Sequence, residues 1–504
     1  MEEVVIIGAG PTGLMLAGEL RLAGVRTTVL EKRAEPGDLP KANGLGGQII
    51  QLLDHRGLLE RFSAGSPFAG RAPGFPFGSV PLKFAELGGE SPLQLLMIQQ
   101  PRLERLLRER AAELGAEIRS GHRLRKLAQD DEGVTLEGDD FRLRARYVVG
   151  CDGGHSLVRE QAGIGFPGTT DDEVMLLGHF TAPQANIFDV AQVNGLRQGW
   201  NHTQNGRLLL TSLQPGVHIV GVREKGTAPA TAVTLAEFAA AVRRVSGVDL
   251  PLGEPIWLSS TVSQARVADR YREGRVFLAG DAAHLFPAGG SALNVGLMDT
   301  ANLAWKLAAH LNGQAPPGLL DTYESERRPV AVHTLRHTRA QAVLERLTGE
   351  DGTALRDLLG ELFAFDQPLR RLGELLQGSD IRYGTAPAEH VNGGCAVSGE
   401  HPLTGRFAPD LALTTTEGPT RVAELMRPAR WVLLNLGFSE LDDLALGNLA
   451  LGNLAGDDRL HVVAAHCVDP PADVLLIRPD GYVAWAGTDG LPEAMTTWLT
   501  PQPA

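Results

Sequence analysis

Runs of consecutive apolar residues alternate with helical stretches at the start of the chain. Residues 2–7 end in VVII, a run of strand length that predicts a strand buried in a parallel sheet. A helix follows as far as Leu22, Gly24 suits its C-cap, and residues 26–30 form a second apolar strand. The pattern therefore predicts a strand–helix–strand unit at the N-terminus.

Helices and short strands continue up to residue 150. Residues 49–59 predict a helix, and a second one begins around Pro101. One face of this second helix carries leucines, namely Leu103, Leu106, Leu107 and Leu114. Residues 123–147 alternate short β-like segments with turn residues, which predicts an antiparallel meander, and residues 147–150 predict another buried strand.

The middle of the chain predicts a separate sheet followed by long helices. Four short strands are expected at residues 175–180, 207–213, 218–223 and 256–262, with one helix at residues 235–245. We interpret them as a sheet inserted into the first domain and suited to covering a ligand. A strand at residues 276–279 returns to that domain, and three helices are expected at residues 291–311, 321–347 (bent near Pro329) and 354–376.

A separable C-terminal unit is expected after Asn392. Strands are predicted at residues 431–436, 460–464, 473–478 and 482–485, with a helix at residues 491–499. The last two strands form a hairpin around the turn Pro479-Asp480-Gly481. This order resembles a thioredoxin-like fold that lacks the cysteine pair. The repeated pentapeptide at residues 445–454 is interpreted as an expanded loop.

Composition indicates an ordinary globular protein of two or three domains. The 504 residues are 43% hydrophobic and 21% charged, and no apolar run approaches the length of a membrane span. The net charge of −13 argues against a nucleic-acid partner. Strand residues begin directly at Met1, so we expect no signal peptide. The cysteines Cys151, Cys395 and Cys467 form no CxxC, which fits a reducing cytoplasm.

The turn after the first strand carries a dinucleotide-binding pattern. Gly8, Gly10 and Gly13 form a GxGxxG, in which glycines permit a tight turn and close approach of a pyrophosphate. Glu31 follows the second strand about 20 residues later, where a ribose hydroxyl needs an acceptor. The unit suits NAD or FAD. Lys32 beside it fits either a 2′-phosphate site or a solvated charge cluster.

A second stretch, from Arg275 to Gly296, also has a strand, a turn and the start of a helix in a row. Its strand leads to Asp281, then to a Pro/Gly-rich turn and to a helix that begins near Ser291. The carboxylate suits a sugar hydroxyl, and the free N–H groups of the first helical turn suit an electron-rich ring oxygen. Together with the N-terminal glycines, this stretch predicts a flavin site.

Three motifs in this order resemble the single-component FAD-dependent aromatic hydroxylases, the class A flavoprotein monooxygenases. They are GAGPTG from Gly8, CDGGHSLVR from Cys151 and GRVFLAGDAAHLFP from Gly274. The chain is most similar to the group acting on aromatic polyketides and related antibiotics, rifampicin monooxygenases included. The resemblance covers about the first 390 residues by motif order, and the C-terminal segment is similar to the tail of the larger members.

The resemblance implies a set of cofactor-binding residues: Gly8, Gly10, Thr12, Gly13, Glu31, Lys32, Lys41, Gln100, Asp152, Asp281, Pro287, Gly290, Leu293 and Asn294. In this family the glycines hold the pyrophosphate, the acidic strand end binds ribose, and the Asp152 motif is associated with both FAD and NADPH. Asp281 would bind the ribityl chain, and the turn before the last helix would lie against the isoalloxazine. The family commonly has Gln where this chain has Ser291, and Arg where it has Lys41.

The implied chemistry belongs to the cofactors. NADPH reduces a tightly but non-covalently bound FAD, O2 adds to give a C4a-hydroperoxide, and hydroxyl transfers to an aromatic ring. Amides at Leu293 and Asn294 would stabilise the reduced flavin. No catalytic side chain or metal is required. For His284 a structural role beside Asp281 is favoured over acid–base catalysis. Packing or surface roles are favoured for four residues of the inserted sheet, Arg197, Trp200, His202 and Arg207.

Other functions remain open on the same scaffold. Baeyer–Villiger oxygen insertion and a non-catalytic flavoprotein that sequesters an antibiotic are both compatible with the motifs. A halogenase fits worse because no WxWxIP-like run exists, a disulfide reductase is excluded by the cysteines, and an NAD-dependent dehydrogenase would be colourless.

The sequence thus predicts an α/β protein. We expect a Rossmann-like FAD-binding domain in two parts (1–174 and 269–392), an inserted β-sheet substrate domain (175–268) and a thioredoxin-like C-terminal domain (393–504). We expect a cytoplasmic monomer or homodimer that acts on a small aromatic molecule and binds neither nucleic acid nor membrane.

Overall fold

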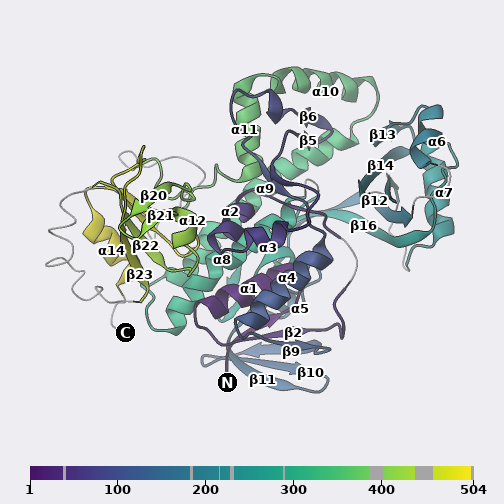
Figure 1. Ribbon diagram of the computed structural model, residues 1–504. Coiled ribbons are helices and arrows are strands. Elements are labelled where there is room, and N and C mark those ends of the chain that lie inside the picture. The colour runs from purple at the N-terminus through teal and green to yellow at the C-terminus, as the bar shows by residue number, and fades with distance from the viewer. Residues whose placement is uncertain are drawn as a thin grey trace.

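The computed structural model describes most of the chain. The described residues are 1–37, 41–181, 186–214, 216–226, 232–287, 290–384, 401–437 and 458–500. The predicted C-terminal boundary near Asn392 and the repeat at residues 445–454 lie outside them. Figure 1 shows a central body, with the inserted sheet and the C-terminal unit on opposite sides. No helix within the described ranges combines the length and the apolar character that a membrane crossing requires.

An eight-stranded sheet forms the central body. Its main path runs β17-β18-β11-β1-β2-β8, and β9 and β10 extend it from β11. The strands are β1 (Glu2–Ile7), β2 (Thr27–Glu31), β8 (Glu117–Ser120), β9 (Leu124–Gln129), β10 (Val134–Gly138), β11 (Arg142–Gly150), β17 (Arg272–Glu273) and β18 (Val276–Leu278). β1 is parallel to β2 and β11, and β11 is parallel to β18, as the buried apolar runs predict. The predicted meander and the buried strand after it share β11, whose first half pairs with β10.

Three helices pack together over this sheet. α1 (Pro11–Leu22) contacts both α4 (Gln100–Glu113) and α8 (Ser291–Leu311) (Figure 1). Pro11 begins α1, where its missing N–H costs nothing because the first turn has no intrahelical acceptor. α8 is buried continuously from Gly296 to Ala308. Such a helix belongs to the core, so the charged residues within it require partners.

The inserted sheet has six strands in the order β13-β14-β15-β12-β16-β19. They are β12 (Gly168–Thr181), β13 (Gly199–Thr203), β14 (Gly206–Gln214), β15 (Val217–Lys225), β16 (Pro255–Val267) and β19 (His284–Leu285). α6 (Ile187–Val193) and α7 (Leu235–Ser246) lie on its outer side (Figure 1), where the apolar side chains of one sheet face are buried. The sequence did not predict α6. It also predicted only the second half of β12, because polar residues at the start of this strand dilute the apolar signal.

Two predicted helices are each divided in two. The helix expected at residues 49–59 is α2 (Gln48–His55) and α3 (Leu59–Ser63), separated at Gly57, whose φ is +65°. The helix expected at residues 354–376 is α10 (Gly349–Phe363) and α11 (Asp366–Gln377). The extended backbone of Phe365 separates these two. α9 (Thr322–Arg346) continues through Pro329.

Short strands complete the central body. They are β3 (Leu45–Gly46), β4 (Ala69–Arg71), β5 (Phe75–Phe77), β6 (Val80–Leu82) and β7 (Gln94–Leu96). β7 pairs with both β3 and β4, and β5 pairs with β6. The β3–β7 pair places the Gly-rich loop before α2 beside the start of α8.

The C-terminal unit has the predicted thioredoxin-like strand order, β23-β22-β24-β25. Its elements are β20 (Ala412–Thr415), β21 (Gly418–Arg421), α12 (Val422–Leu425), β22 (Trp431–Asn435), β23 (Leu460–Ala464), β24 (Val474–Ile477), β25 (Val483–Gly487) and α14 (Leu491–Leu499). β22 and β23 are parallel, and the hairpin β24–β25 is antiparallel. The unit docks through buried charge: Arg478 contacts Glu326 at 2.8 Å and also pairs with Asp480.

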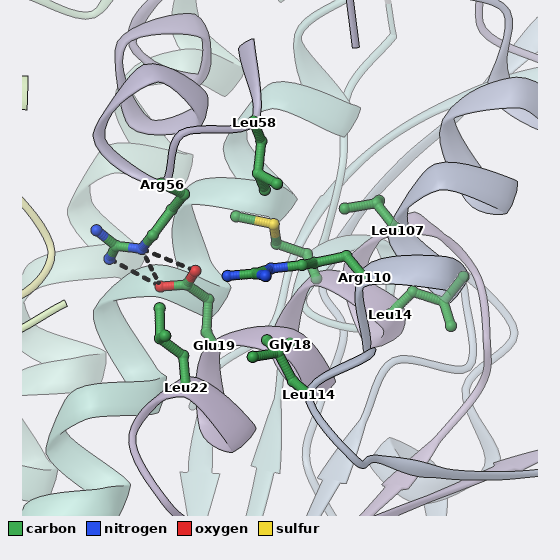
Figure 2. A pocket seen from close by; sticks show the side chains of 10 residues that line it. Leu14, Gly18, Glu19, Leu22, Arg56, Leu58, Leu107, Arg110 and Leu114 are labelled. Carbon is green, nitrogen blue, oxygen red and sulfur yellow. Dashed lines mark hydrogen bonds and ion pairs between the residues drawn. The ribbon is translucent and has the colours of Figure 1, made fainter. Parts of the chain in front are cut away.

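A second buried ion pair faces the same interface. Figure 2 shows the Arg56 guanidinium against the Glu19 carboxylate, at 2.8 Å. Arg56 also donates to the carbonyl oxygens of Met426 and Pro479 in the C-terminal unit. The cavity in Figure 2 lies beside Glu19 and is lined by residues of α1 from Leu14 to Leu22. Arg56 therefore links α1 to the C-terminal unit.

Candidate functional site

The ends of three neighbouring parallel strands carry the three sequence motifs. Ile7 pairs with Gly150, and Gly150 pairs with Leu278, so the carboxyl ends of β1, β11 and β18 lie in one row. Gly8 has φ +105°, and a Cβ on it would lie 2.4 Å from the carbonyl oxygen of Cys151. The first two motifs therefore touch, and only glycine fits at this contact.

The glycines of the first motif have different surroundings. A Cβ on Gly13 would lie 2.0 Å from the Gly8 carbonyl oxygen, so Gly13 permits α1 to pack against the end of β1. A Cβ on Gly10 would meet no atom of the described residues within 4 Å, its chain neighbours aside. Gly10 therefore leaves an open space above the N-terminus of α1, as a bound pyrophosphate requires.

The third motif packs directly against α1. Gly280 has φ +62°, and a Cβ on it would lie 2.6 Å from Thr12 Oγ1. A Cβ on Gly296 of α8 would lie 2.9 Å from the Gly280 Cα and 3.1 Å from Thr12 Oγ1. The structure thus brings together the glycine turn, the Asp281-bearing turn and α8, which are far apart in the sequence.

Glu31 is buried beside the glycine turn. Its carboxylate accepts hydrogen bonds from the backbone N–H groups of Ala9 at 2.8 Å and Arg33 at 2.9 Å. Burial opposes ionisation, but these bonds outweigh it and hold the pKa of Glu31 below its usual value. Glu31 is therefore an ionised acceptor at the end of β2. Lys32 is exposed, which agrees with a solvated side chain.

Asp152 and Arg159 connect the second and third motifs. Asp152 Oδ2 accepts from the Val158 N–H at 3.2 Å, and Oδ1 is buried with no hydrogen-bond partner among the described residues. Burial raises the pKa of Asp152. Arg159 donates to the carbonyl oxygens of Ala282 at 2.8 Å and Gly154 at 2.9 Å. Asp152 thus keeps an acceptor atom for a ligand.

Asp281 is an exposed side chain on a buried turn. Gly280 and Ala282 on either side are buried. Partial removal of the carboxyl group from water raises the pKa of Asp281. Electrostatic interactions with His284 and Lys41 act in the opposite direction. The loop of Lys41 therefore lies within electrostatic range of the Asp281 turn, although neither side chain pairs with the other.

The start of α4 joins this loop. The Gln100 N–H donates to the Ala42 carbonyl at 2.9 Å, and Gln100 Nε2 donates to Glu104 at 2.8 Å. Asn43 Oδ1, one residue on, is buried with no partner among the described residues. Lys41 and Gln100, two predicted cofactor residues, are thereby held on the same side of the site.

The first turn of α8 begins at a glycine cap. Gly290 has φ +64° and is exposed, so no side chain caps this turn. Asn294 Oδ1 accepts from the Gly46 N–H at 3.1 Å, which fastens the turn to β3. Leu293 and Pro287 are half-buried nearby in the sequence. The backbone N–H groups at the start of a helix attract negative charge.

His284 is buried and hydrogen-bonded to a carboxylate. Its Nε2 hydrogen-bonds Asp299 at 2.8 Å, a contact compatible with the expected structural role. Asp299 also accepts from the Gly280 N–H at 3.1 Å and from Arg327 Nε at 2.8 Å. Burial alone would raise the pKa of Asp299. The interactions with Arg327 and His284 outweigh burial and bring this pKa below its usual value, so the carboxylate is ionised.

Sequence reasoning did not identify Asp299 and Arg327. Asp299 could have been noticed, because an acidic residue inside the apolar run of α8 needs a buried partner. Its partner could not be identified, because α9 carries several arginines and only the packing selects one.

The four candidate residues of the inserted sheet make packing contacts. Arg207 is buried and pairs with Glu173, and His202 donates to the Glu345 carbonyl at 3.0 Å. The contact of His202 fastens the sheet to the end of α9, whereas the Arg207–Glu173 pair lies within the sheet. Trp200 packs beside an arginine and the Arg197 N–H binds Asn201, both within the same sheet.

These residues fit FAD. The open space at Gly10, the ionised Glu31, the spare oxygen of Asp152 and the uncapped turn after Gly290 lie along the strand ends. They match, in order, a pyrophosphate, a ribose hydroxyl, a further polar group and an electron-rich ring edge.

Comparisons with known proteins agree with this geometry. Residues 1–338 match the family model described as FAD binding domain. Residues 401–501 match the model described as Aromatic-ring hydroxylase, C-terminal.

Individual relatives align over nearly the whole chain. The 12-dehydrotetracycline 5-monooxygenase/anhydrotetracycline 6-monooxygenase of Streptomyces rimosus is 42% identical, covering 99% of each chain. A rifampicin monooxygenase of Streptomyces venezuelae is 41% identical over 97% of this chain and 96% of its own. The solved structure of CabE, an aromatic hydroxylase from angucycline biosynthesis, superposes with a TM-score of 0.87 at 36% identity, covering 100% of both chains.

Proposed function

Because this chain belongs to the family of FAD-dependent aromatic-ring hydroxylases, we propose that it is an NADPH-consuming monooxygenase of an aromatic polyketide or antibiotic-type phenolic substrate. The names of the relatives, which specify tetracycline-type and rifampicin substrates, support this class. NADPH as reductant and O2 as oxygen donor, by the route expected from the motifs, belong to the proposal. So do a cytoplasmic location and a monomeric or homodimeric state.

One observation carries the proposal: the contact between Thr12 and Gly280. It joins the turn after β1, which suits the ADP half of FAD, to the turn after β18, which leads to α8 and suits the flavin half. One extended dinucleotide can therefore use both turns. A dinucleotide held only by the first turn would not need the close packing of Gly280 and Gly296.

Each part of the chain then has a defined task. Gly10 leaves room for the pyrophosphate, Glu31 accepts from a ribose hydroxyl, and Asp281 accepts from the ribityl chain. The amides of Leu293 and Asn294, at the positive end of the α8 dipole, stabilise negative charge on the bound ring. When bound, reduced FAD together with O2 supplies the electrophilic oxygen atom.

One face of the inserted sheet is apolar and only partly covered. Leu177, Gly221 and Leu209 are neighbours across three strands, and a Cβ on Gly221 would touch Met175, Leu209 and Leu177. These three side chains are half-buried, unlike those of the opposite face, which are covered by α6 and α7. A half-covered apolar face of this kind suits an aromatic ring.

The test is NADPH consumption by the purified yellow protein with a panel of aromatic polyketides and rifamycins, followed by product mass. Consumption coupled to the gain of one oxygen supports the proposal. NMR of the product separates ring hydroxylation from Baeyer–Villiger insertion. Tight binding of a panel member without any stimulated consumption would identify the alternative, a flavoprotein that sequesters its ligand.

A further inference from the structure

A half-open cleft lies between the first turn of α8, the middle of α9 and the end of α11. Its cavity volume is about 60 Å³, and it is open to solvent on one side. Asn294 and Val295 of α8, His333 of α9 and Asp380 are among its lining residues. Half of its lining residues are polar, Arg327 and His337 among them, and the apolar ones are Ile49, Val295, Met298, Val330, Leu375, Leu376 and Ile381. Apolar side chains together with convergent polar groups are typical of small-molecule sites.

Asp380, which lines this cleft, has an unused acceptor atom. Both donors that reach its carboxylate bind the same oxygen: His333 Nε2 lies 3.1 Å from Oδ2, and Arg371 donates to Oδ2 at 2.9 Å. Oδ1 is buried and has no hydrogen-bond partner among the described residues, and the side chain is only 10% exposed. A buried acceptor without a donor is costly, so a ligand that donates to it is favoured.

The charge state of Asp380 specifies the kind of ligand. Burial would raise its pKa, but the hydrogen bond from His333 and the charge of Arg371 hold the pKa below its usual value. The carboxylate is therefore ionised and can only accept. An anionic ligand group is repelled, and Arg371 disfavours a cationic one. A neutral hydroxyl on an apolar framework fits best.

We propose that this cleft receives a phenolic or enolic hydroxyl of the aromatic substrate, which donates to Asp380 Oδ1. The inference rests on the proposed function, because it takes the ligand to be the aromatic substrate. Asn294 places the cleft next to the turn assigned to the flavin ring. A hydroxyl that donates to a carboxylate enriches its ring in electrons, which an electrophilic oxygen transfer requires.

The experiment uses the FAD-loaded protein and two probes, 1-naphthol and 1-methoxynaphthalene, which differ in the donor. Equilibrium binding is followed by probe fluorescence in wild type, Asp380→Asn and the control Asp366→Asn, which alters an exposed pair with Arg370 on α11. We expect wild type and the control to prefer naphthol by ~10-fold or more, and D380N to lose most of that preference.

The inference is overturned if wild type binds both probes equally, if neither binds, or if D380N keeps the wild-type preference. Should D380N fail to fold, Leu375→Trp fills the cleft from a half-buried position and is expected to weaken both probes. Unchanged binding in L375W would then overturn it. Flavin content and NADPH oxidation of the same preparations test the proposed function separately, since both can persist when the probe preference does not.

Discussion

Arg327 on α9 donates through Nε to Asp299 on α8 at 2.8 Å, and their side chains are 1% and 0% exposed. The same carboxylate binds the Gly280 N–H and His284, while Arg327 also donates to the Val295 carbonyl at 3.1 Å. One buried ion pair therefore fastens the Asp281-bearing turn to the first turn of α8. It fixes the distance between the two parts of the site that are assigned to the flavin half of FAD.

Replacing Arg327 tests this support. Arg327→Met leaves Asp299 buried with one charged partner fewer, which we expect to cost about 3–5 kcal/mol of unfolding free energy and to reduce FAD retention. The control Arg336→Met changes an exposed residue of the same helix. Urea unfolding and flavin content after gel filtration measure both effects, and equal values for the two variants would refute the role of the pair.

Alanine substitutions at Gly280 and Gly313 distinguish steric clash from backbone strain. Gly280→Ala adds a Cβ at φ +62° that meets Thr12 Oγ1 at 2.6 Å, whereas Gly313→Ala adds one at φ +69° with nothing within 4 Å. Both share a left-handed penalty of about 1–2 kcal/mol. We expect G280A to lose about 1–3 kcal/mol more and to bind FAD more weakly.

Removal of the clash provides the internal check. Thr12→Ala deletes the two side-chain atoms nearest the new Cβ, so the double variant G280A/T12A should recover part of the lost stability and FAD affinity. An additive double variant would show that the two turns are not in contact in solution.

The charge at the start of α8 should influence the flavin potential. Asn294→Asp keeps the acceptor for the Gly46 N–H but places a negative charge beside the amides that stabilise the reduced ring. We expect a midpoint potential lower by on the order of 30 mV, equal to about 1.4 kcal/mol for two electrons. Asn312→Asp, at the exposed C-cap of the same helix, is the control for which dye-coupled potentiometry should find no change.

His55 should make the protein sensitive to acid. Burial lowers its pKa from 6.5 to about 3, and Arg56 and Arg421 act in the same direction. The unfolded chain takes up a proton below pH 6.5 but the folded one does not, so this stability is present above pH 6.5 and lost as the pH falls. The loss should reach about 2 kcal/mol by pH 5.

Unfolding free energies at several pH values provide the test. His55→Gln removes the titrating ring that stacks on Phe407, so its stability should fall less steeply between pH 6.5 and pH 5 than that of wild type. His461→Gln, an exposed change, should keep the wild-type slope. A wild-type slope in H55Q would refute the assignment.

Local patterns predicted the parts of this fold that depend on neighbouring residues. The run before Gly8, the spacing to Glu31 and the hairpin at Asp480 each lie within one short stretch, and the structure contains β1, β2 and the β24–β25 hairpin there. The buried parallel strands were recognisable because both of their faces are apolar.

Features that depend on distant contacts could not be predicted. The break at Phe365 carries no glycine or proline at that position, so the local sequence does not mark it. The partner of His284 is Asp299, 15 residues away on α8, although Asp281 is nearer in sequence. The unused oxygen of Asp380 arises because α9 and α11 donate to the same atom.

A crystal structure of the purified yellow protein tests the central claim most directly. We predict one FAD, with its pyrophosphate over Gly10, a ribose hydroxyl on Glu31, its ribityl chain at Asp281 and its ring edge at the amides of Leu293 and Asn294. A protein without flavin, or a flavin that contacts the glycine turn but not the Asp281 turn, would contradict the account.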